Sequence, residues 1–166
     1  MGVILRVEEA GGLPRVAWRW EPETDILAGS LSPAPSGPAG SLELSGHDGS
    51  VAVVDLTGGR VAGLDVVVWP EVVTVPELVV PAAVRSGTIR VMPANGAPES
   101  LATLELDVAL SARANLAEDL IHLRVGAPRP TVVVQVADCL QVEVDEGGGL
   151  AGFWLSEVPP LLNGDS

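Results

Sequence analysis

The chain has 166 residues, of which 47% are apolar, and it carries a formal net charge of −13. This length predicts one ordinary domain or two small halves that share a core, and so acidic a surface argues against binding to nucleic acid. The longest apolar runs, such as residues 66–69, are far shorter than the roughly 20 residues of a membrane-spanning helix.

The N-terminus and the cysteine content indicate where the protein resides. The first twenty residues contain Glu8 and Glu9 and lack a basic start followed by an apolar stretch, so we expect no signal peptide. Cys139 is the only cysteine, which excludes an internal disulfide and fits a reducing compartment. The sequence therefore predicts a cytoplasmic protein without membrane association.

Strand patterns begin close to the N-terminus, at residues 3–7 and 14–20. Trp18 and Trp20 are two residues apart and therefore share one face of the second strand. Tryptophan is favoured at protein interfaces, so this pair is the first candidate interaction surface. Packing against the edge of the core is the alternative role.

One motif occurs twice in the chain, at residues 48–70 and 138–159. In each copy an Asp is followed seven residues later by a second Asp, then by a Gly-rich turn, an Ala-Gly pair and a Pro. A repeat of this kind specifies architecture before it specifies chemistry. We therefore divide the chain into two similar halves, residues 1–80 and 81–166, that share one core.

Period-two alternation continues in the second half. Residues 104–110, 121–125 and 140–145 alternate between apolar and polar side chains, which is typical of strands with one buried face. The proline-rich but apolar region 70–100 reads as an edge strand or an extended connection. Residues 111–120 have fair helix propensity, but their counterpart in the first half reads as a turn, so we expect a short turn there.

The predicted fold is mainly β, with two antiparallel meanders of about six strands each, related by a pseudo-twofold axis. The halves are expected to pack as a sandwich or as a closed barrel-like sheet. Matching Gly63 with Gly152 places Leu64 and Phe153 on an apolar core side in both copies. The residues that follow them, Asp65 and Trp154, lie on the opposite side, where we expect the two halves to differ.

Part of the sequence resembles a known family. The segment Trp20–Leu27, followed by the hairpin Asp48–Val66, resembles the small bacterial domain of unknown function DUF2283, whose pattern is an aromatic-acid-x-Glu-x-Asp turn, a strand and a D-x-x-G-x-x-x-G-[IL] hairpin. Residues 118–155 resemble it again, although Ala114 replaces the aromatic residue and neither copy has the family's strand Tyr. The resemblance covers about half of the chain and implies a small β-rich domain, here duplicated, with no catalytic residue to carry over.

The second Asp of each motif copy is a candidate for two roles. Asp55 and Asp145 precede Gly-rich turns, where a carboxylate can accept backbone N–H bonds. The same residues, together with Glu146, are candidate ligands of a divalent cation. Because no ligand spacing like that of an EF-hand loop is present, the structural role in the turn is the favoured one.

The two histidines are the remaining candidates for chemistry. His47 lies in a turn beside Asp48, and His122 lies on the polar side of its strand, where a dyad with Cys139 is one alternative. No nucleophile elbow and no nucleotide-binding loop is present. We expect no catalytic residue and no cofactor, and a hydrolase-type enzyme is the least favoured alternative.

The favoured function is that of an acidic, non-enzymatic binding protein, similar to an immunity protein or antitoxin that binds a basic protein. The alternative is a β domain that binds a small molecule or a divalent metal. The candidate interaction residues are Trp18, Trp20, His122 and Trp154. The sequence leaves the oligomeric state open, a homodimer included.

Overall fold

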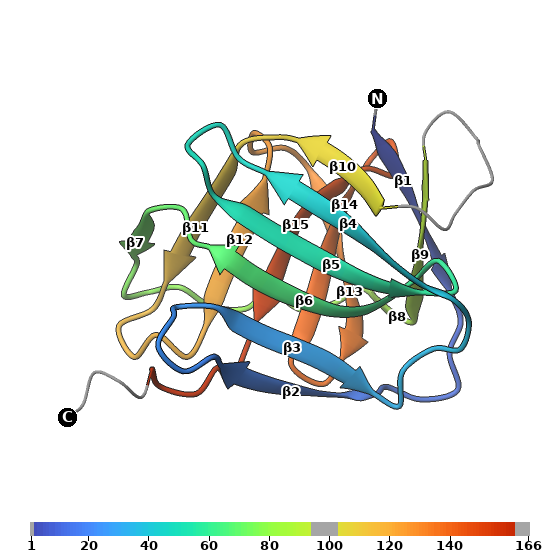
Figure 1. Cartoon of the computed structure of the whole chain (residues 1–166), viewed down its shortest axis with the longest axis horizontal. Coiled ribbons are helices and arrows are strands. Elements are labelled where there is room, and N and C mark those ends of the chain that lie inside the picture. Colours follow the sequence, from blue (N-terminus) through green and yellow to red (C-terminus); the bar gives the residue numbers. More distant parts are fainter. Residues whose placement is uncertain (1, 94–102, 162–166) are drawn as a thin grey trace.

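The computed structural model describes residues 2–93 and 103–161, and these residues form fifteen β-strands arranged as two sheets packed face to face (Figure 1). Sheet A contains β1 (Val3–Glu8), β2 (Arg15–Trp20), β3 (Leu27–Ser32), β4 (Ala39–Ser45), β5 (Val51–Thr57), β6 (Arg60–Val68), β9 (Thr88–Pro93) and β10 (Thr103–Asp107). Sheet B contains β7 (Val72–Thr74), β8 (Arg85–Ser86), β11 (Leu110–Ala114), β12 (Ile121–Val125), β13 (Thr131–Ala137), β14 (Leu140–Asp145) and β15 (Leu150–Leu155). The mainly β prediction is confirmed.

Corresponding strands of the two halves take the same order in their sheets. The order β2-β3-β6-β5-β4 in sheet A matches β11-β12-β15-β14-β13 in sheet B. In each sheet a further strand is added in parallel at the end of this series, β10 beside β4 and β8 beside β13. Of the two predicted arrangements the sandwich is correct, because neither sheet closes on itself within the described ranges.

Strand pairing crosses the predicted boundary between residues 80 and 81. β1 pairs with β9, and β7 of the first half pairs with β11 of the second. The β1–β9 ribbon also contacts both motif turns, because the Leu5 amide donates to the Gly148 carbonyl and the Val91 amide donates to the Gly59 carbonyl. Since Leu5 and Val91 are paired in the ribbon, one pair of residues connects the two sheets.

The predicted strand over residues 104–110 belongs to two strands. β10 ends at Asp107 in sheet A and β11 begins at Leu110 in sheet B. Between them the Val108 amide donates to the Ser45 carbonyl of sheet A, and the next residue, Ala109, accepts from Gly126 of sheet B. An uninterrupted alternation of side chains hides this change of sheet, because the same apolar side faces the core before and after it.

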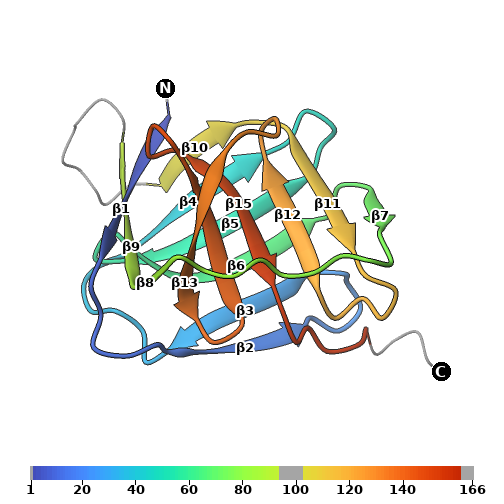
Figure 2. The same cartoon turned by 180° about the vertical axis from the view of Figure 1, so that it is seen from behind.

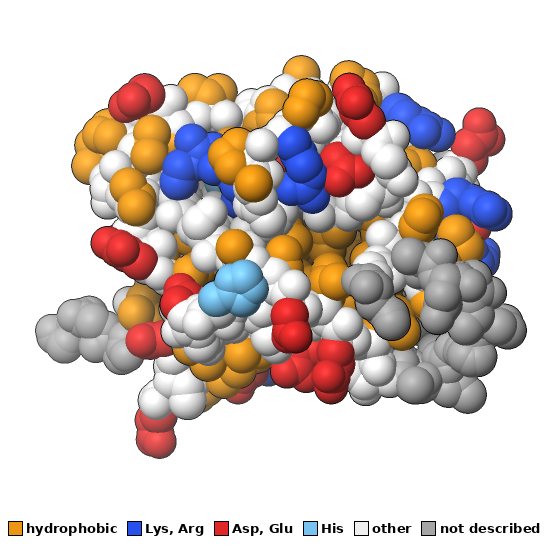
Figure 3. All heavy atoms as spheres, turned by 90° about the horizontal axis from the view of Figure 1, so that it is seen from above, with side chains coloured by type: hydrophobic (Ala, Val, Ile, Leu, Met, Phe, Trp, Pro, Cys, Tyr) orange, Lys and Arg blue, Asp and Glu red, His pale blue; other side chains and the backbone are white. Residues whose placement is uncertain are grey.

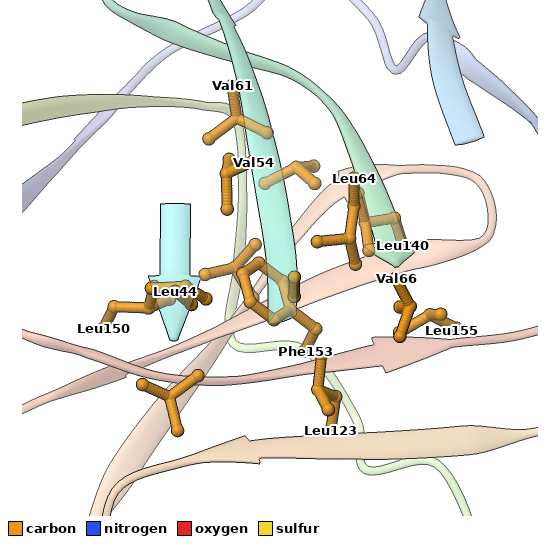
Figure 4. Packing of buried hydrophobic residues seen from close by; sticks show 14 of the residues in the cluster. Leu44, Val54, Val61, Leu64, Val66, Leu123, Leu140, Leu150, Phe153 and Leu155 are labelled. Atoms are coloured by element: carbon orange, nitrogen blue, oxygen red, sulfur yellow. The ribbon is translucent and has the colours of Figure 1, made fainter. Parts of the chain in front are cut away.

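The core lies between the inner faces of the two sheets. Phe153 lies at its centre, 1% exposed, among Leu64, Leu123 and Val54 (Figure 4). The prediction that Leu64 and Phe153 share the core side is confirmed, and Asp65 points to the opposite side of its strand.

The outer faces of the two sheets differ in what covers them. Figure 2 shows that the connection between β7 and β8 crosses the outer face of sheet B. Its ends are fixed where the Val75 amide donates to the Ala114 carbonyl and the Val84 amide donates to the Val133 carbonyl. Two polar side chains on this outer face are buried, with His122 only 2% exposed and Gln141 6% exposed.

Candidate functional site

The register of the strands corrects the correspondence between the two motif copies. Asp55 pairs with Gly63, whereas Gly152 pairs with Glu143 and not with Asp145. The reason is the length of the turns: two residues separate β5 from β6, and four separate β14 from β15. Asp55 therefore occupies the place of Glu143 on the outer face of its sheet, two residues before its strand ends.

Asp145 has the predicted turn role. Its carboxylate accepts the Gly147 and Gly149 amides at 3.0 and 2.7 Å and the Arg129 guanidinium at 2.9 Å. The Arg129 bond, followed by the Gly149 amide, lowers the pKa of Asp145. Glu146 is exposed in the same turn, and no group of three or more potential metal ligands comes together in residues 2–93 and 103–161.

Asp55 instead forms a pair with Asp65. The two half-buried carboxyl groups are hydrogen-bonded to each other, and Asp65 also accepts the Gly29 amide. Burial, followed by the neighbouring charge of Asp55, raises the pKa of Asp65 to about 7. Burial also raises the pKa of Asp55. Two carboxyl groups that share one site cannot both ionise freely.

The Asp55–Asp65 pair belongs to a larger surface that carries acidic side chains, which we name the acidic face. It consists of the outward side chains Glu43, Asp55, Asp65, Glu105 and Asp107. On β3, β4, β5, β6 and β10 the single basic residue is Arg60, and it is bound to Glu8 at 2.8 Å. Seen from the end with the β4–β5 turn, acidic side chains dominate the sheet A half, and arginines gather over sheet B (Figure 3).

The tryptophan pair of β2 shares one face, as the sequence predicts, and both side chains are partly buried against the core. The Trp18 indole N–H donates to the Ser156 carbonyl at 3.0 Å, and the Trp20 indole N–H donates to the Pro159 carbonyl at 2.7 Å. Trp20 also packs on Trp69, with ring centroids 5.9 Å apart. The chain's own C-terminal segment thus occupies the polar edges of both indoles.

The outer face of sheet B carries a row of side chains with polar groups at positions that correspond to the level of Asp65 in sheet A. Its members are opposite each other on five neighbouring strands: Arg113, His122, Trp154, Gln141 and Gln135. The corresponding residues on β2, β3 and β6 are Arg19, Ala28 and Asp65. The outer face therefore distinguishes the two halves, at the position where the sequence predicts it.

Three of these side chains, Arg113, His122 and Trp154, form a closed network with Glu143, which we name the His122 cluster. Arg113 Nη2 lies 2.9 Å from His122 Nδ1, and His122 Nε2 lies 3.1 Å from Glu143 Oε1. Trp154 stacks on His122 at 4.2 Å, and its indole N–H donates to Glu143 Oε2 at 2.8 Å. Since Arg113 has donors only, Nδ1 accepts and Nε2 carries the proton.

The Glu143 carboxylate is the centre of this network. Burial raises the pKa of Glu143, but hydrogen bonds from His122 and then from Trp154 outweigh burial and hold it below its usual value. Glu143 reaches His122 across Gly152, where an added Cβ would lie 2.7 Å from Glu143 Oε1 and 3.0 Å from the Leu123 carbonyl. Glycine at this position therefore makes the cluster sterically feasible.

We expect Glu143→Gln to destabilise the protein by about 1–3 kcal/mol. The amide can accept only one of the two N–H groups, and its own NH₂ would face the other donor. His122 cannot compensate by moving its proton, because Arg113 already donates to Nδ1. Denaturant unfolding would measure the loss, with Glu105→Gln on the exposed edge as control. Equal losses in both variants would contradict the assigned hydrogen bonds.

The other predicted residues lie apart from this network. Cys139 is buried in the turn before β14, and burial, followed by the charge of Asp138, raises its pKa to about 12, so that it is a thiol at neutral pH. His122 is brought to Glu143 and not to Cys139. His47 is exposed, and the Asp48 carboxylate beside it binds the Ser50 amide and hydroxyl at 3.0 and 2.6 Å.

Two hollows in the surface of the described residues differ in what lines them. The larger, about 510 Å³, lies among the loops at one end of the sandwich, with Leu13, Leu31, Pro33 and Ile89 in its wall. Its one charged residue, Arg60, is bound to Glu8. The smaller, about 130 Å³, lies over the His122 cluster below the β12–β13 loop. Only the smaller hollow combines convergent charged groups with buried polar side chains.

No protein-family model matches this chain, and no curated protein matches it. The resemblance to DUF2283 therefore remains a prediction. No helix among residues 2–93 and 103–161 is long and apolar enough to cross a membrane.

Proposed function

We propose that this chain is a non-enzymatic binding protein that holds a basic protein partner on the acidic face of sheet A. The observation that carries the proposal is the charge of this face: five carboxyl side chains point outward from four neighbouring strands that present no free basic group among their described residues. Complementary charge speeds the encounter of two proteins and selects against wrong partners.

Apolar side chains on the same face also favour a protein partner. Val51, Val53 and Val67 point outward between the carboxyl groups and are only partly exposed. Val53 is paired with both Glu43 and Asp65 and so lies between them. Protein interfaces commonly combine an apolar centre with a polar rim. A small inorganic cation would use the carboxylates but not the valines.

The Asp55–Asp65 pair gives the face a specific place for a cation. A guanidinium or ammonium group of the partner would relieve the repulsion between the two carboxylates and lower their raised pKa. Binding at this pair would then release a proton near neutral pH. A cytoplasmic immunity protein or antitoxin, which neutralises a basic toxin, is the kind of protein that fits this proposal.

The test compares the wild-type chain with two triple variants of equal charge as baits in host extract. Glu43→Gln/Glu105→Gln/Asp107→Asn neutralises the acidic face, and Glu9→Gln/Glu77→Gln/Glu118→Gln removes three exposed carboxylates elsewhere. We expect a basic protein that is retained by the wild type and the second variant and lost by the first, at least about tenfold. Retention by all three baits, or equal loss from both variants, would contradict the proposal.

A further inference from the structure

We propose that the hollow over the His122 cluster is a binding site for a small oxyanion, which is held by Arg113 and Arg124. This site lies on sheet B and is independent of the acidic face. Its wall includes Arg113, Arg124 and Arg129, three of the nine basic residues of a chain whose net charge is −13. A cluster of three guanidinium groups is therefore unexpected in so acidic a protein.

Arg129 forms the wall of the hollow and has no free donor for a ligand at Nε or Nη1. Its guanidinium binds Asp145 and the carbonyls of Val125, Ala127 and Leu150, all at 2.8–2.9 Å. These bonds hold the β12–β13 loop against the start of β15. Arg129 therefore shapes the hollow, and its charge is compensated by Asp145.

Arg113 and Arg124 are not compensated in this way. The Arg124 side chain makes no hydrogen bond or ion pair with any other residue in the described ranges, although Arg124 is only partly exposed. Arg113 donates one Nη2 bond to His122, while its Nε is buried without a partner among the described residues. Buried donors are nearly always satisfied in folded proteins, so an unpaired guanidinium nitrogen indicates a missing acceptor.

The one acidic side chain in the wall does not supply that acceptor. Both oxygens of Glu143 are occupied, one by His122 Nε2 and the other by the Trp154 indole. Both Glu143 oxygens thus accept from groups other than Arg113 and Arg124, which leaves the donors of these arginines for a ligand, although the Glu143 charge lies near that of Arg124. His122 serves here as a positioning residue, which fixes Arg113 on one side and Glu143 on the other.

The size of the hollow limits the ligand. A volume of about 130 Å³ corresponds to about four water molecules at roughly 30 Å³ each. This space suits a compact oxyanion such as phosphate, sulfate or a small carboxylate. The planar fork of arginine matches the paired oxygens of these anions. A nucleotide or a sugar phosphate would not fit as a whole.

Sheet A provides a matched control, because it lacks the site at the corresponding position. Ser30 stands in place of Arg124, and Ala28 stands in place of His122. Arg19 takes the place of Arg113 but is 73% exposed in its side chain and bound to Glu21. Removing the charge of Arg19 therefore changes the net charge as Arg124→Gln does, without touching the hollow.

The test is a titration of the full chain with inorganic phosphate, sulfate and acetate at constant ionic strength, followed through the indole N–H signals in NMR spectra. We expect a saturable shift of the Trp154 signal, with affinity reduced at least about tenfold in Arg124→Gln and unchanged in Arg19→Gln. Tighter binding of phosphate or sulfate would identify a tetrahedral anion as the ligand class, and tighter binding of acetate a carboxylate. No saturable shift with any anion up to about 20 mM, or equal weakening by both variants, would overturn the proposal.

Discussion

Asp65→Asn is expected to stabilise the protein at pH 8 by about 2 kcal/mol and to remove most of the pH dependence of stability between pH 4 and 7. The native pKa of Asp65 is about 7, against about 4 for an unfolded Asp. The native state therefore binds a proton that the unfolded state has already released, so stability falls as the pH rises from about 4 to 7 and is level above. The full difference corresponds to about 4 kcal/mol, which we halve because Asp65 is partly solvated and coupled to Asp55.

The amide of Asn suits this position. Its oxygen can accept the Gly29 amide as Asp65 does, and its NH₂ can donate to the Asp55 carboxylate. Unfolding by guanidinium chloride at several pH values between 4.5 and 8 measures the effect, with Asp107→Asn as the control for the loss of one charge on the same sheet. A variant as pH-dependent as the wild type would show that Asp65 does not hold the proton.

Below about pH 4 the direction of the pH effect reverses. The pKa values of Glu8, Glu143 and Asp145 are lowered in the native state. A group of this kind stabilises the fold above its unfolded pKa and loses that contribution as the pH falls through its native value. The wild-type protein should therefore be most stable in mildly acidic solution.

Phe153→Ala is expected to cost about 3–5 kcal/mol and to lower the melting temperature by about 10 °C. Phe153 is the only phenylalanine and is 1% exposed, and it lies between the sheets with Leu64 and Leu123 nearby (Figure 4). The packed strands around it cannot collapse fully into the space left by the ring. Thermal unfolding measures the loss, with Leu116→Ala as a control, because Leu116 is 71% exposed. A loss below about 1 kcal/mol would mean that the sheets repack around the cavity.

Strand positions and buried sides are predictable from this sequence because both follow from local alternation. The alternation in β14 identifies its buried side. Aligning Gly63 of the first motif copy with Gly152 of the second identifies the outward positions 65 and 154 as the place where the halves differ. These inferences need only the period of a strand. They hold whatever the order of strands in the sheet.

The register and the long-range pairing were not predictable in the same way. The motif aligns Asp55 with Asp145, but the different lengths of the two turns place Asp55 opposite Gly63 and in the position of Glu143. The parallel additions of β8 and β10 were not predictable, because β10 alternates like any other strand and β8 is only two residues long. Turn length and sheet order are properties of the assembled fold.

The candidate site on sheet B illustrates the same limit. His122 alternates with apolar residues and looks like a solvated side chain, yet it is only 2% exposed, with Trp154 stacked on its ring. Its partners Arg113, Glu143 and Trp154 come from three other strands. A separate signal was available for Glu143, since the glycine opposite it, Gly152, provides the space for its side chain.

The pairing of the first strand with a strand from the middle of the chain has a consequence for synthesis in the cell. β1 leaves the ribosome well before its partner β9, so Leu5 must wait until Val91 has been made. The turn that binds Leu5, at Gly148, is made later still. Contacts so distant in sequence form slowly and leave strand edges open in the meantime. The contacts of β1 with β9 and with the β14–β15 turn should therefore be among the last to form.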